Sequence, residues 1–357
     1  MNIKVLYIAR EPQKILSGGV SVEKRNLSIL QSLYGDSNVI VEYLPRTNLR
    51  RAALSLATLS SYGVSRKQEK TILQSQERYK CKLVFIEGSL WGHIVYELSK
   101  RECKVVVHMH NIEAELYKDR LKTEKGIVSY IRYCFVKFNE CLSVKYASSI
   151  ITLNQRDYDN MLNIYGRKAN IILPITFPER KIQYSLDERG NFLLFVGSDF
   201  FPNIEGIIWF IKNVAKNVNI KIRIAGGCCK NTLLKDMALP ENVELIGYVD
   251  DLDYYYSKAA AVIAPIFKGS GMKTKTIEAM SYGKTIIGTG EAFVGIENEA
   301  SSIGFICNTT DEFIRAISNF DRKLVNPYTL QSFKASFTNN VFKNKLELFL
   351  SNIVSIQ

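Results

Sequence analysis

The segment from Gly269 to Met280 combines two glycines with two lysines at a spacing that could bind a diphosphate. Gly269 and Gly271 can turn successive backbone N–H groups toward an anion, and a helix beginning near Lys273 adds the positive end of its dipole. Lys273 and Lys275 would lie at that end, where a cation lowers stability unless an anion binds nearby. The segment therefore predicts an anion-binding loop, with an ordinary loop and helix as the alternative.

Glu278 lies on the same predicted helix, where its carboxylate could accept hydrogen bonds from the paired hydroxyls of a ribose. A Walker loop is excluded, because neither Gly269 nor Gly271 begins the required run of four spacer residues, Gly-Lys and Ser or Thr. The N-terminal region also lacks a G-x-G-x-x-G motif. These residues predict a nucleoside diphosphate site outside both common motifs.

Two shorter motifs stand where predicted strands end, which is where parallel sheets bind their ligands. Gly18 and Gly19 follow the first strand and precede a helix that begins near Ser21, although a simple turn explains two glycines equally well. His110 ends the fourth strand, where it could hydrogen-bond a sugar hydroxyl or stabilise developing charge. His108 would point to the same side of that strand, and for it we expect a structural role.

The elements that must position these residues alternate between short β-branched runs and longer amphipathic segments, which predicts parallel sheets covered by helices. The predicted strands are 3–9, 39–44, 83–87, 104–110, 149–153, 170–173, 192–197, 220–225, 243–246, 261–264, 285–288 and 304–307. The predicted helices are 22–33, 91–100, 127–147, 156–164, 204–217, 251–258, 273–282, 311–320 and 342–353, with further helix within 49–80. The expected fold class is α/β, with two tandem Rossmann-like doubly wound domains facing across a cleft.

The domains are expected at 1–173 and 191–340, separated by a linker at 174–190 that contains Pro174 and Pro178. Residues 341–357 would form a C-terminal helix that could pack back on the first domain. The net charge of +12 is concentrated in the first half. Residues 1–173 hold 27 Lys and Arg against 16 Asp and Glu, whereas residues 174–357 hold 20 against 19. This asymmetry favours an anionic partner, with a solvated basic surface as the alternative.

The composition also bears on location and redox state. No stretch approaches the roughly 20 apolar residues that span a bilayer, and the N-terminus has a strand pattern in place of a signal peptide. We therefore expect a cytoplasmic protein. The 7 scattered cysteines lack metal-ligand spacing and are expected to be reduced packing residues.

Together, these motifs resemble those of the retaining glycosyltransferases of family 4, or glycosyl transferases group 1, which have the GT-B fold. In that family a G-x-G loop and a K-x-x-E-A helix bind the diphosphate and ribose of the donor. The resemblance runs through nearly the whole chain, and its strongest part falls on Gly269, Gly271, Lys275, Glu278 and Ala279, continuing into Gly283 and Lys284. It implies that domain 1–173 binds the acceptor and domain 191–340 the nucleotide-sugar.

The resemblance also implies roles for individual residues. His110 and Glu278 would be catalytic, and Glu113 would lie on the acceptor side. Donor contacts are implied for Gly18, Gly19, Gly197, Tyr248, Val249, Gly269, Ser270, Gly271, Met272, Lys273, Lys275 and Glu278.

The sequence departs from the family pattern at two places. The family commonly has an Arg or Lys after the glycine that matches Gly197, and a Lys a few positions later, whereas Ser198, Asp199 and Asn203 stand here. Ser270 replaces the first Glu of the family's E-x7-E pattern. Neutralisation of the diphosphate would then depend on the two lysines and on backbone amides. The pair Asp251 and Asp253 resembles a metal-binding D-x-D, but a helix cap and first-turn acid is the stronger interpretation.

The resemblance implies transfer of a sugar from a nucleoside diphosphate to a hydroxyl acceptor, with retention and without a metal or other cofactor. We expect a saccharide or lipid-linked saccharide as acceptor, in bacterial surface polysaccharide or glycolipid synthesis, with peripheral association at the inner face of an anionic membrane. A sugar-nucleotide epimerase of the same fold and a non-enzymatic anion-binding module are the alternatives. Nucleic acid is not an expected partner, because no RNA-binding motif is present.

Overall fold

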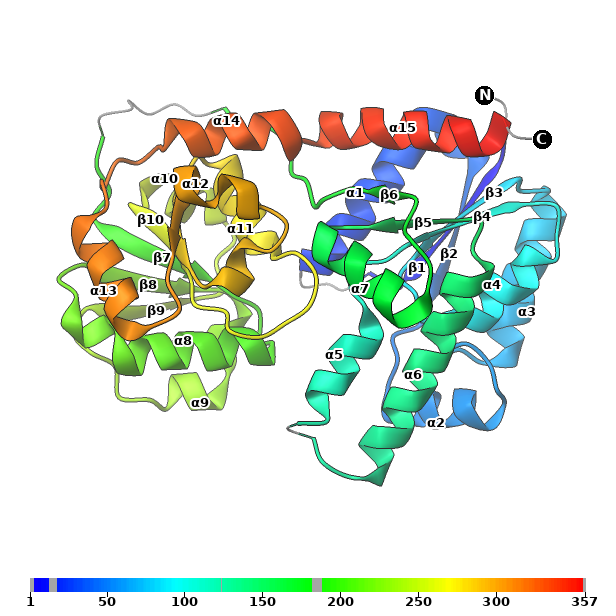
Figure 1. Cartoon of the computed structure of the whole chain (residues 1–357), viewed down its shortest axis with the longest axis horizontal. Coiled ribbons are helices and arrows are strands. Elements are labelled where there is room, and N and C mark those ends of the chain that lie inside the picture. Colours follow the sequence, from blue (N-terminus) through cyan, green and yellow to red (C-terminus); the bar gives the residue numbers. More distant parts are fainter. Residues whose placement is uncertain (1–2, 13–17, 123, 182–187, 356–357) are drawn as a thin grey trace. The chain divides into compact units, whose positions relative to one another are not determined.

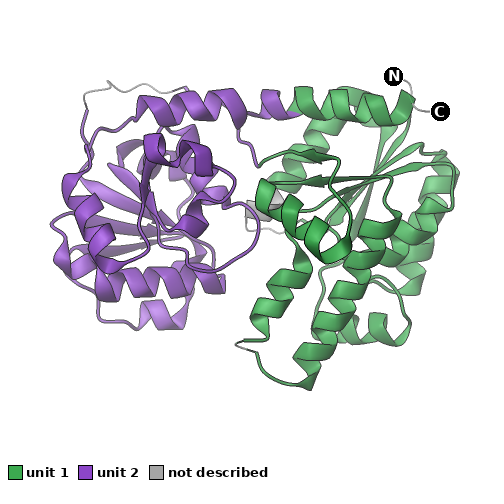
Figure 2. Ribbon diagram, in the orientation of Figure 1, with its two compact units in different colours: residues 1–174, 343–357 green, residues 175–342 purple. Residues whose placement is uncertain are grey.

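The computed structural model describes residues 3–12, 18–122, 124–181 and 188–355, and the side chains of all of these except residues 18–21. The chain divides into two compact units. Unit 1 comprises Met1–Pro174 and Lys343–Gln357, and unit 2 comprises Ile175–Phe342 (Figure 2). Part of the predicted linker, residues 182–187, lies outside the described residues. Each unit is considered by itself below.

Unit 1 is built on a six-stranded parallel sheet with the strand order β2-β1-β3-β4-β5-β6. Its strands are β1 (Val5–Arg10), β2 (Val39–Leu44), β3 (Leu83–Glu87), β4 (Lys104–His108), β5 (Ser149–Thr152) and β6 (Ile171–Ile172). Its helices are α1 (Gly18–Tyr34), α2 (Leu49–Ala57), α3 (Arg66–Tyr79), α4 (Gly92–Ser99), α5 (Glu113–Arg120), α6 (Ile127–Tyr146) and α7 (Gln155–Tyr165). Helix α15 (Asn339–Ser355) belongs to this unit from Lys343 onward.

Unit 2 repeats this plan with a six-stranded sheet in the order β12-β11-β10-β7-β8-β9. Its strands are β7 (Phe192–Val196), β8 (Lys221–Ala225), β9 (Val243–Gly247), β10 (Ala261–Ala264), β11 (Thr285–Gly288) and β12 (Gly304–Ile306). Its helices are α8 (Phe201–Asn213), α9 (Thr232–Lys235), α10 (Leu252–Lys258), α11 (Thr274–Ser281), α12 (Ala300–Ile303), α13 (Thr310–Asn319) and α14 (Pro327–Ser336). Helices cover both faces of each sheet (Figure 1).

The strand order reverses beside the first strand of each sheet. In unit 1 the chain moves from β1 to β2 on one side and then continues from β3 on the other. In unit 2 the reversal lies between β7 and β10. Ligands of open parallel sheets bind beyond the carboxyl ends of the strands at such reversals. The loops after β1, β3, β7 and β10 are therefore the ones to inspect for a site.

The sequence-based fold class is confirmed, because both units are parallel α/β sheets covered by helices. Two local predictions need correction. The strand predicted to reach His110 ends at His108, where pairing with β5 stops. The glycine turn predicted before Ser21 is helical, because α1 already begins at Gly18. The first turn of a helix donates no bonds to earlier helical residues, so glycine is tolerated there. Helices α5, α9, α12 and α14 were not predicted, since each is short, with 8, 4, 4 and 10 residues respectively.

The core of each unit follows from its fully buried strands. Both faces of a parallel sheet are covered, so its central strands need apolar side chains on each side. Residues Leu83–Ile86 of β3 and Ala261–Ala264 of β10 are completely buried. Helix α8 approaches β10 closely at Gly206, where a Cβ atom would lie 1.8 Å from the carbonyl oxygen of Pro265. This glycine brings the start of α8 next to the loop after β10.

Candidate active site

The loop between β10 and α11 has the backbone shape predicted for an anion site. Gly269 and Gly271 adopt φ angles of 142° and 64°, which side-chain-bearing residues rarely adopt. Helix α11 begins directly afterwards at Thr274, so its first-turn amides face the same end. The loop follows the strand at the reversal point of the unit 2 sheet. Its place in the fold is that of a ligand loop.

Lys273 caps this loop but its ammonium group is directed at protein oxygens. Its Nζ atom lies 2.7 Å from Oε1 of Glu291 and 2.9 Å from the carbonyl oxygen of Gly271. Both side chains of the ion pair are mostly buried. Glu291 therefore balances the positive charge that the sequence analysis assigned to phosphate binding.

Lys275 projects from the first turn of α11 toward β7 and α8. Its Nζ atom donates to Oδ1 of Asn203 at 2.7 Å and lies 4.2 Å from the centre of the Phe195 ring. Burial lowers the pKa of Lys275 to about 7, and only 9% of the residue is exposed. An anion held close to this amine would favour its protonated form. Lys275 and Asn203 join the two elements that flank the reversal point.

Glu278 lies one turn further along α11. It accepts a hydrogen bond of 3.1 Å from the hydroxyl of Tyr256 on α10. Burial raises the pKa of Glu278, although Tyr256 and Arg180 counteract this effect. Tyr256 stacks on Tyr282 with ring centres 4.5 Å apart, which fixes the donor hydroxyl. Glu278 is thus a positioned and partly desolvated carboxylate.

The other predicted donor residues of unit 2 gather at the same sheet edge. Gly197 follows β7, and its amide donates to Ala225 at the end of β8. Tyr248 and Val249 follow β9, and the Tyr248 side chain is 53% exposed. Ser270 is half-buried in the glycine loop. Met272 differs from the others, because its side chain is buried against Gly295 and acts as a packing residue.

In unit 1, Glu87 at the end of β3 is the centre of a buried polar cluster. Its Oε2 atom accepts from Nδ1 of His108 at 2.9 Å and from Nε2 of His110 at 2.7 Å. Its Oε1 atom accepts from Nδ2 of Asn26 at 2.7 Å and lies 3.0 Å from the hydroxyl of Tyr7. Burial alone would raise the pKa of Glu87, but the two imidazoles hold it well below its ordinary range. Glu87 is thus an ionised carboxylate that orients both histidines.

The two histidines differ in exposure and in charge. His108 is completely buried, and burial lowers its pKa. The side chain of His110 is 19% exposed. Burial would lower its pKa as well, but the hydrogen bond and charge of Glu87 outweigh this and raise it. His108 is thus internal, whereas the His110 ring is partly accessible.

The predicted donor residues Gly18 and Gly19 form the first turn of α1, beyond the end of β1. Ser17, which precedes them, lies outside the described residues. Glu23, on the next turn of α1, interacts electrostatically with His110, and burial raises its pKa. The start of α1 and the His110 loop thus belong to the same edge of the unit 1 sheet.

Glu113 begins helix α5 immediately after the His110 loop. Its backbone amide and that of Ala114 donate to Glu140 of α6, at 2.9 Å each. Glu140 also accepts from the hydroxyls of Ser89 at 2.6 Å and Tyr165 at 2.7 Å. Burial raises the pKa of Glu140 to about 7. A buried carboxylate therefore fixes the start of the helix that carries Glu113.

Two groups of side chains have the chemistry of metal ligands. One atom each from Glu87, His108 and His110 lie within 4.8 Å of one another. Both imidazoles are hydrogen-bonded to one oxygen of Glu87, so an ion would have to displace those bonds. Asp251 caps α10 through the amide of Tyr254, as the sequence indicated. Asp253 pairs with Arg180 at 2.8 Å, so this pair has structural partners.

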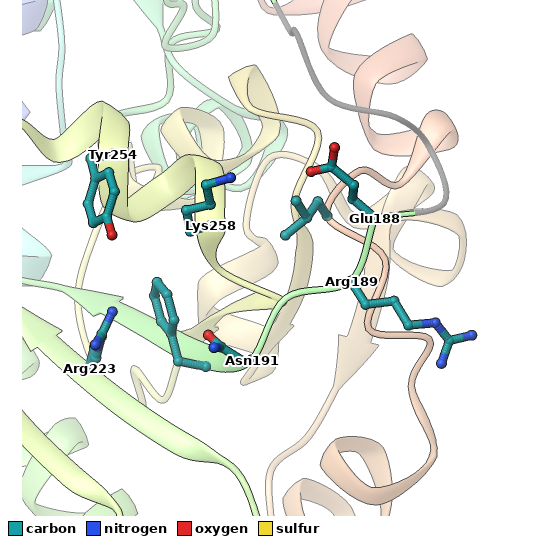
Figure 3. A pocket seen from close by; sticks show the side chains of 8 residues that line it. Glu188, Arg189, Asn191, Arg223, Tyr254 and Lys258 are labelled. Carbon is teal, nitrogen blue, oxygen red and sulfur yellow. The ribbon is translucent and has the colours of Figure 1, made fainter.

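Unit 2 also has a hollow of about 360 Å³ at the opposite edge of its sheet. It is lined by residues that precede β7 and by Arg223, Tyr254 and Lys258. Figure 3 shows the side chain of Arg189 pointing away from Arg223 and Tyr254, so the charged groups around the hollow do not all converge. Because parallel sheets bind ligands at their carboxyl edge, we do not assign the active site to this hollow.

Several residues of the site were not predicted from the sequence. Glu87 had a detectable signal, because it is the single acid in an apolar strand and stands at its carboxyl end. Glu140, Glu291 and Asn26 carried no comparable signal, since their partners are distant in sequence. Asn203 was noted only as a departure from the family pattern, yet it is the hydrogen-bond partner of Lys275.

Comparison with known proteins agrees with this fold. Residues 190–320 match the family model of glycosyl transferases group 1, which includes the β10–α11 segment. The fold is that of the GT-B glycosyltransferases. The matched segment and the shared fold therefore support a glycosyltransferase, as the sequence indicated.

Individual relatives are distant in sequence. An uncharacterised 44.6 kDa protein from the cps region of Klebsiella pneumoniae is 24% identical over 245 residues, or 61% of this chain. The match spans 60% of that relative. Sucrose-phosphate synthase from Thermosynechococcus elongatus has a TM-score of 0.73 at 13% identity, with 99% of this chain and 100% of that chain covered. HepE from Anabaena in complex with UDP has a TM-score of 0.65 at 11% identity, covering 98% and 100%.

Proposed function

We propose that this glycosyltransferase moves a sugar from a nucleoside diphosphate sugar to a hydroxyl acceptor, with retention of anomeric configuration. The observation that carries the proposal is the β10–α11 segment. Two positive-φ glycines, a helix N-terminus and two lysines adjoin the reversal point of the unit 2 sheet. The UDP complex of the structural relative HepE supports a nucleoside diphosphate as the ligand.

Leaving-group stabilisation would be the main catalytic effect. As the bond between the anomeric carbon and the diphosphate oxygen breaks, negative charge grows on the diphosphate. Preorganised amides and cations can lower such a barrier by several kcal/mol, or about 2.7–4 kcal/mol for one donor. In this proposal the first-turn amides of α11 and the Lys275 side chain, protonated beside the diphosphate, supply that stabilisation, while the charge of Lys273 is already balanced by Glu291. Glu278 accepts hydrogen bonds from the ribose hydroxyls.

The acceptor side of the reaction is assigned to unit 1. The acceptor oxygen forms the new bond to the anomeric carbon, and its proton passes to the departing nucleoside diphosphate. His110, oriented by Glu87, would hydrogen-bond a hydroxyl of the donor sugar or stabilise developing charge near the anomeric carbon. Glu113 is proposed to contact the acceptor. The scheme includes no metal, since Lys275 and the backbone amides are assigned to the diphosphate charge.

The setting proposed is surface polysaccharide or glycolipid synthesis at the cytoplasmic face of a membrane. The relative from a cps region supports the polysaccharide part. The positive charge of residues 1–173 supports a saccharide or lipid-linked saccharide acceptor near an anionic surface. Among the described helices, none is both long and apolar enough to cross a bilayer.

A thermal-shift comparison of UDP, GDP and ADP would identify the base, because a ligand that binds only the folded state raises its stability. Activity is then measured with the matching sugar nucleotides, with and without a chelator. Lys275→Ala and Glu278→Ala should each lose at least about tenfold in transfer while keeping the fold. Full activity in both variants would contradict the assigned site. Conversion of the donor sugar without an acceptor would instead indicate an epimerase.

A further inference from the structure

The outward face of α6 is unusually apolar for a helix surface that is exposed to solvent. Exposed side chains recur along it at helical spacing, at Ile127, Ile131, Cys134, Phe138, Cys141 and Lys145. Val128 and Tyr130 extend the same face, and both are more than half exposed. We call this set, from Ile127 to Lys145, the α6 outer face. It is apolar over four turns and faces solvent.

The opposite face of α6 already has its packing partners. Phe135, Val136 and Val144 are buried there, together with the helix-fixing carboxylate Glu140. A helix that is apolar all round is ordinarily buried on every side. One side of α6 is instead open, with 76% of Ile127 and 51% of Phe138 exposed. The α6 outer face is therefore an apolar surface to which the rest of the described chain supplies no cover.

The exposed charged residues of α6 itself are all basic. The only acid of α6 is Glu140, which is completely buried. Lys137 and Lys145 are exposed and make no ion pair with any residue that the structure describes. Arg132 is also on this helix and pairs with Glu124 from the preceding turn. Lys137 and Lys145 thus give the margin of the apolar surface on α6 a positive charge.

Helix α2 repeats this combination in the same unit. Leu49, Leu54 and Leu56 are exposed, Arg50 and Arg51 are its only charged residues, and it has no acid. The segment that follows α2 packs against α6, since the centres of the Tyr62 and Phe135 rings lie 5.9 Å apart. Figure 1 shows α2 and the beginning of α6 at the same end of unit 1. Two helices of one unit thus expose apolar side chains among basic ones.

We propose that the α6 outer face, together with α2, docks on the surface of a bilayer that contains anionic lipids. Apolar side chains would enter the boundary between headgroups and acyl chains, while Lys137, Lys145 and Arg50 contact lipid phosphates. The inference rests on the proposed function in one respect, because an acceptor held at a membrane gives this docking its purpose. It requires nothing of the donor site.

Charge favours a lipid surface over a second copy of the chain. Two copies joined through this face would bring lysines of the same sign together, in a half of the sequence with 27 cations and 16 anions. Like charges brought close are destabilising, whereas anionic headgroups neutralise them. Exposed apolar patches with a charged margin are typical of sites that bind another surface. Dimerisation is accordingly an outcome that the experiment must exclude.

The test is flotation of the full chain with phosphatidylcholine vesicles, with and without phosphatidylglycerol. Wild type should float with the anionic vesicles at low salt and much less with neutral ones. The double variant Ile131→Asp, Phe138→Asp should lose at least about tenfold in vesicle partitioning. Leu233→Asp, at a position 69% exposed on α9 of unit 2, is the matched control and should float like wild type. UDP binding measured on all three proteins reports on the fold and on the donor site independently.

The cysteines of the α6 outer face provide a direct reporter. A polarity-sensitive fluorophore on Cys134, in a Cys141→Ser background, should shift to the blue when anionic vesicles are added. Equal flotation of the double variant and wild type, or an unshifted fluorophore, would overturn the proposal. Light scattering that shows a wild-type dimer and a monomeric double variant would also overturn it, because the occupant would then be a second copy.

Discussion

The ammonium group of Lys275 lies 2.7 Å from the side-chain oxygen of Asn203, across the point where the unit 2 sheet reverses its strand order. Lys275 comes from α11, after β10, and Asn203 from α8, after β7. The amine is buried against the Phe195 ring, and burial lowers its pKa to about 7. A buried amine with a pKa near 7 can change its protonation state when a diphosphate binds beside it.

Donor binding should therefore take up a proton at a pH above about 7. A diphosphate beside Lys275 favours the ammonium form, so the affinity for UDP should fall as the pH rises through the pKa of the free protein. Calorimetric titrations in two buffers with different ionisation enthalpies measure this uptake. It should be absent from Lys275→Met. Binding without proton uptake in wild type would contradict the proposed contact.

The lowered pKa of Lys275 should also make the stability of the fold depend on pH. In the unfolded chain the lysine keeps its ordinary pKa of 10.5, whereas in the folded chain it titrates near 7. The stabilising contribution of the neutral amine is therefore present above the unfolded pKa and is lost as the pH falls through the folded one. The free energy of unfolding in urea should be measured for wild type and Lys275→Met. As the pH falls from about 10 to about 7, the value for wild type should fall relative to that of the variant.

The pKa of His110 should lie above its ordinary value, because the hydrogen bond and charge of Glu87 outweigh the effect of burial. The pKa of His108 should lie below its ordinary value, because burial dominates there. The chain contains 3 histidines, so an NMR titration can resolve each ring. Glu87→Gln should lower the pKa of His110, reduce transfer, and cost about 3–5 kcal/mol of stability, as expected when a buried ion pair loses one partner. The charged His110 stabilises the fold fully below its unfolded pKa of about 6.5, and this contribution is lost as the pH rises through the folded pKa.

An unchanged His110 titration in Glu87→Gln would show that the carboxylate does not set its charge. His93→Gln is the matched control, because that ring lies on α4 and pairs with Glu69 at 3.0 Å. Its loss should leave the titration of His110 as it is in wild type.

Much of the fold could be predicted from the chain, because parallel strands and amphipathic helices leave distinct periodic patterns. The strands at 39–44, 83–87, 261–264 and 285–288 end where the pattern ends. The β10–α11 segment was found through its glycines and lysines. Its position at a reversal point depends on the order of the strands in the sheet, which hydrophobic periodicity cannot predict.

The contacts that orient the site were harder to predict. Glu87 and His110 are separated by 23 residues, and Lys275 and Asn203 by 72, so only the folded sheet brings them together. The sequence also did not show that Lys273 would be paired with Glu291. For α6, apolar residues on every side cannot indicate which side packs on the unit and which remains exposed.

Glu140 should make the start of α5 sensitive to pH. Its folded pKa of about 7 exceeds the ordinary value of 4.5, so its contribution to stability is present below 4.5 and is lost as the pH rises toward 7. Glu140→Gln should remove up to about 3 kcal/mol of this change, because each pKa unit corresponds to about 1.4 kcal/mol. Unfolding of both proteins between about pH 4 and pH 8 measures the difference. Parallel stability curves for wild type and variant would contradict the assignment.

Lys284 is expected to be a structural lysine that does not contact the donor. Its completely buried ammonium group donates to the carbonyl oxygens of Ser257, Ala259 and Leu324, at 3.0, 3.0 and 2.6 Å. Lys284→Met leaves these buried acceptors without a donor and should cost about 1–3 kcal/mol of stability. UDP affinity, measured below the unfolding temperature, should remain near the wild-type value. A large loss of affinity in the folded variant would place Lys284 in the donor site.

The most direct test of the central claim is a calorimetric titration of UDP into wild type, Lys275→Met and Lys268→Met at neutral pH. Lys268 lies on the same loop but is exposed and paired with Glu205 at 3.2 Å, so its variant is the matched control. A charge-assisted contact to a phosphate is worth about 1.5–3 kcal/mol, so Lys275→Met should bind UDP about 10- to 100-fold more weakly, while Lys268→Met binds like wild type. Equal affinity in Lys275→Met and wild type would contradict the assignment of the nucleoside diphosphate to the β10–α11 segment.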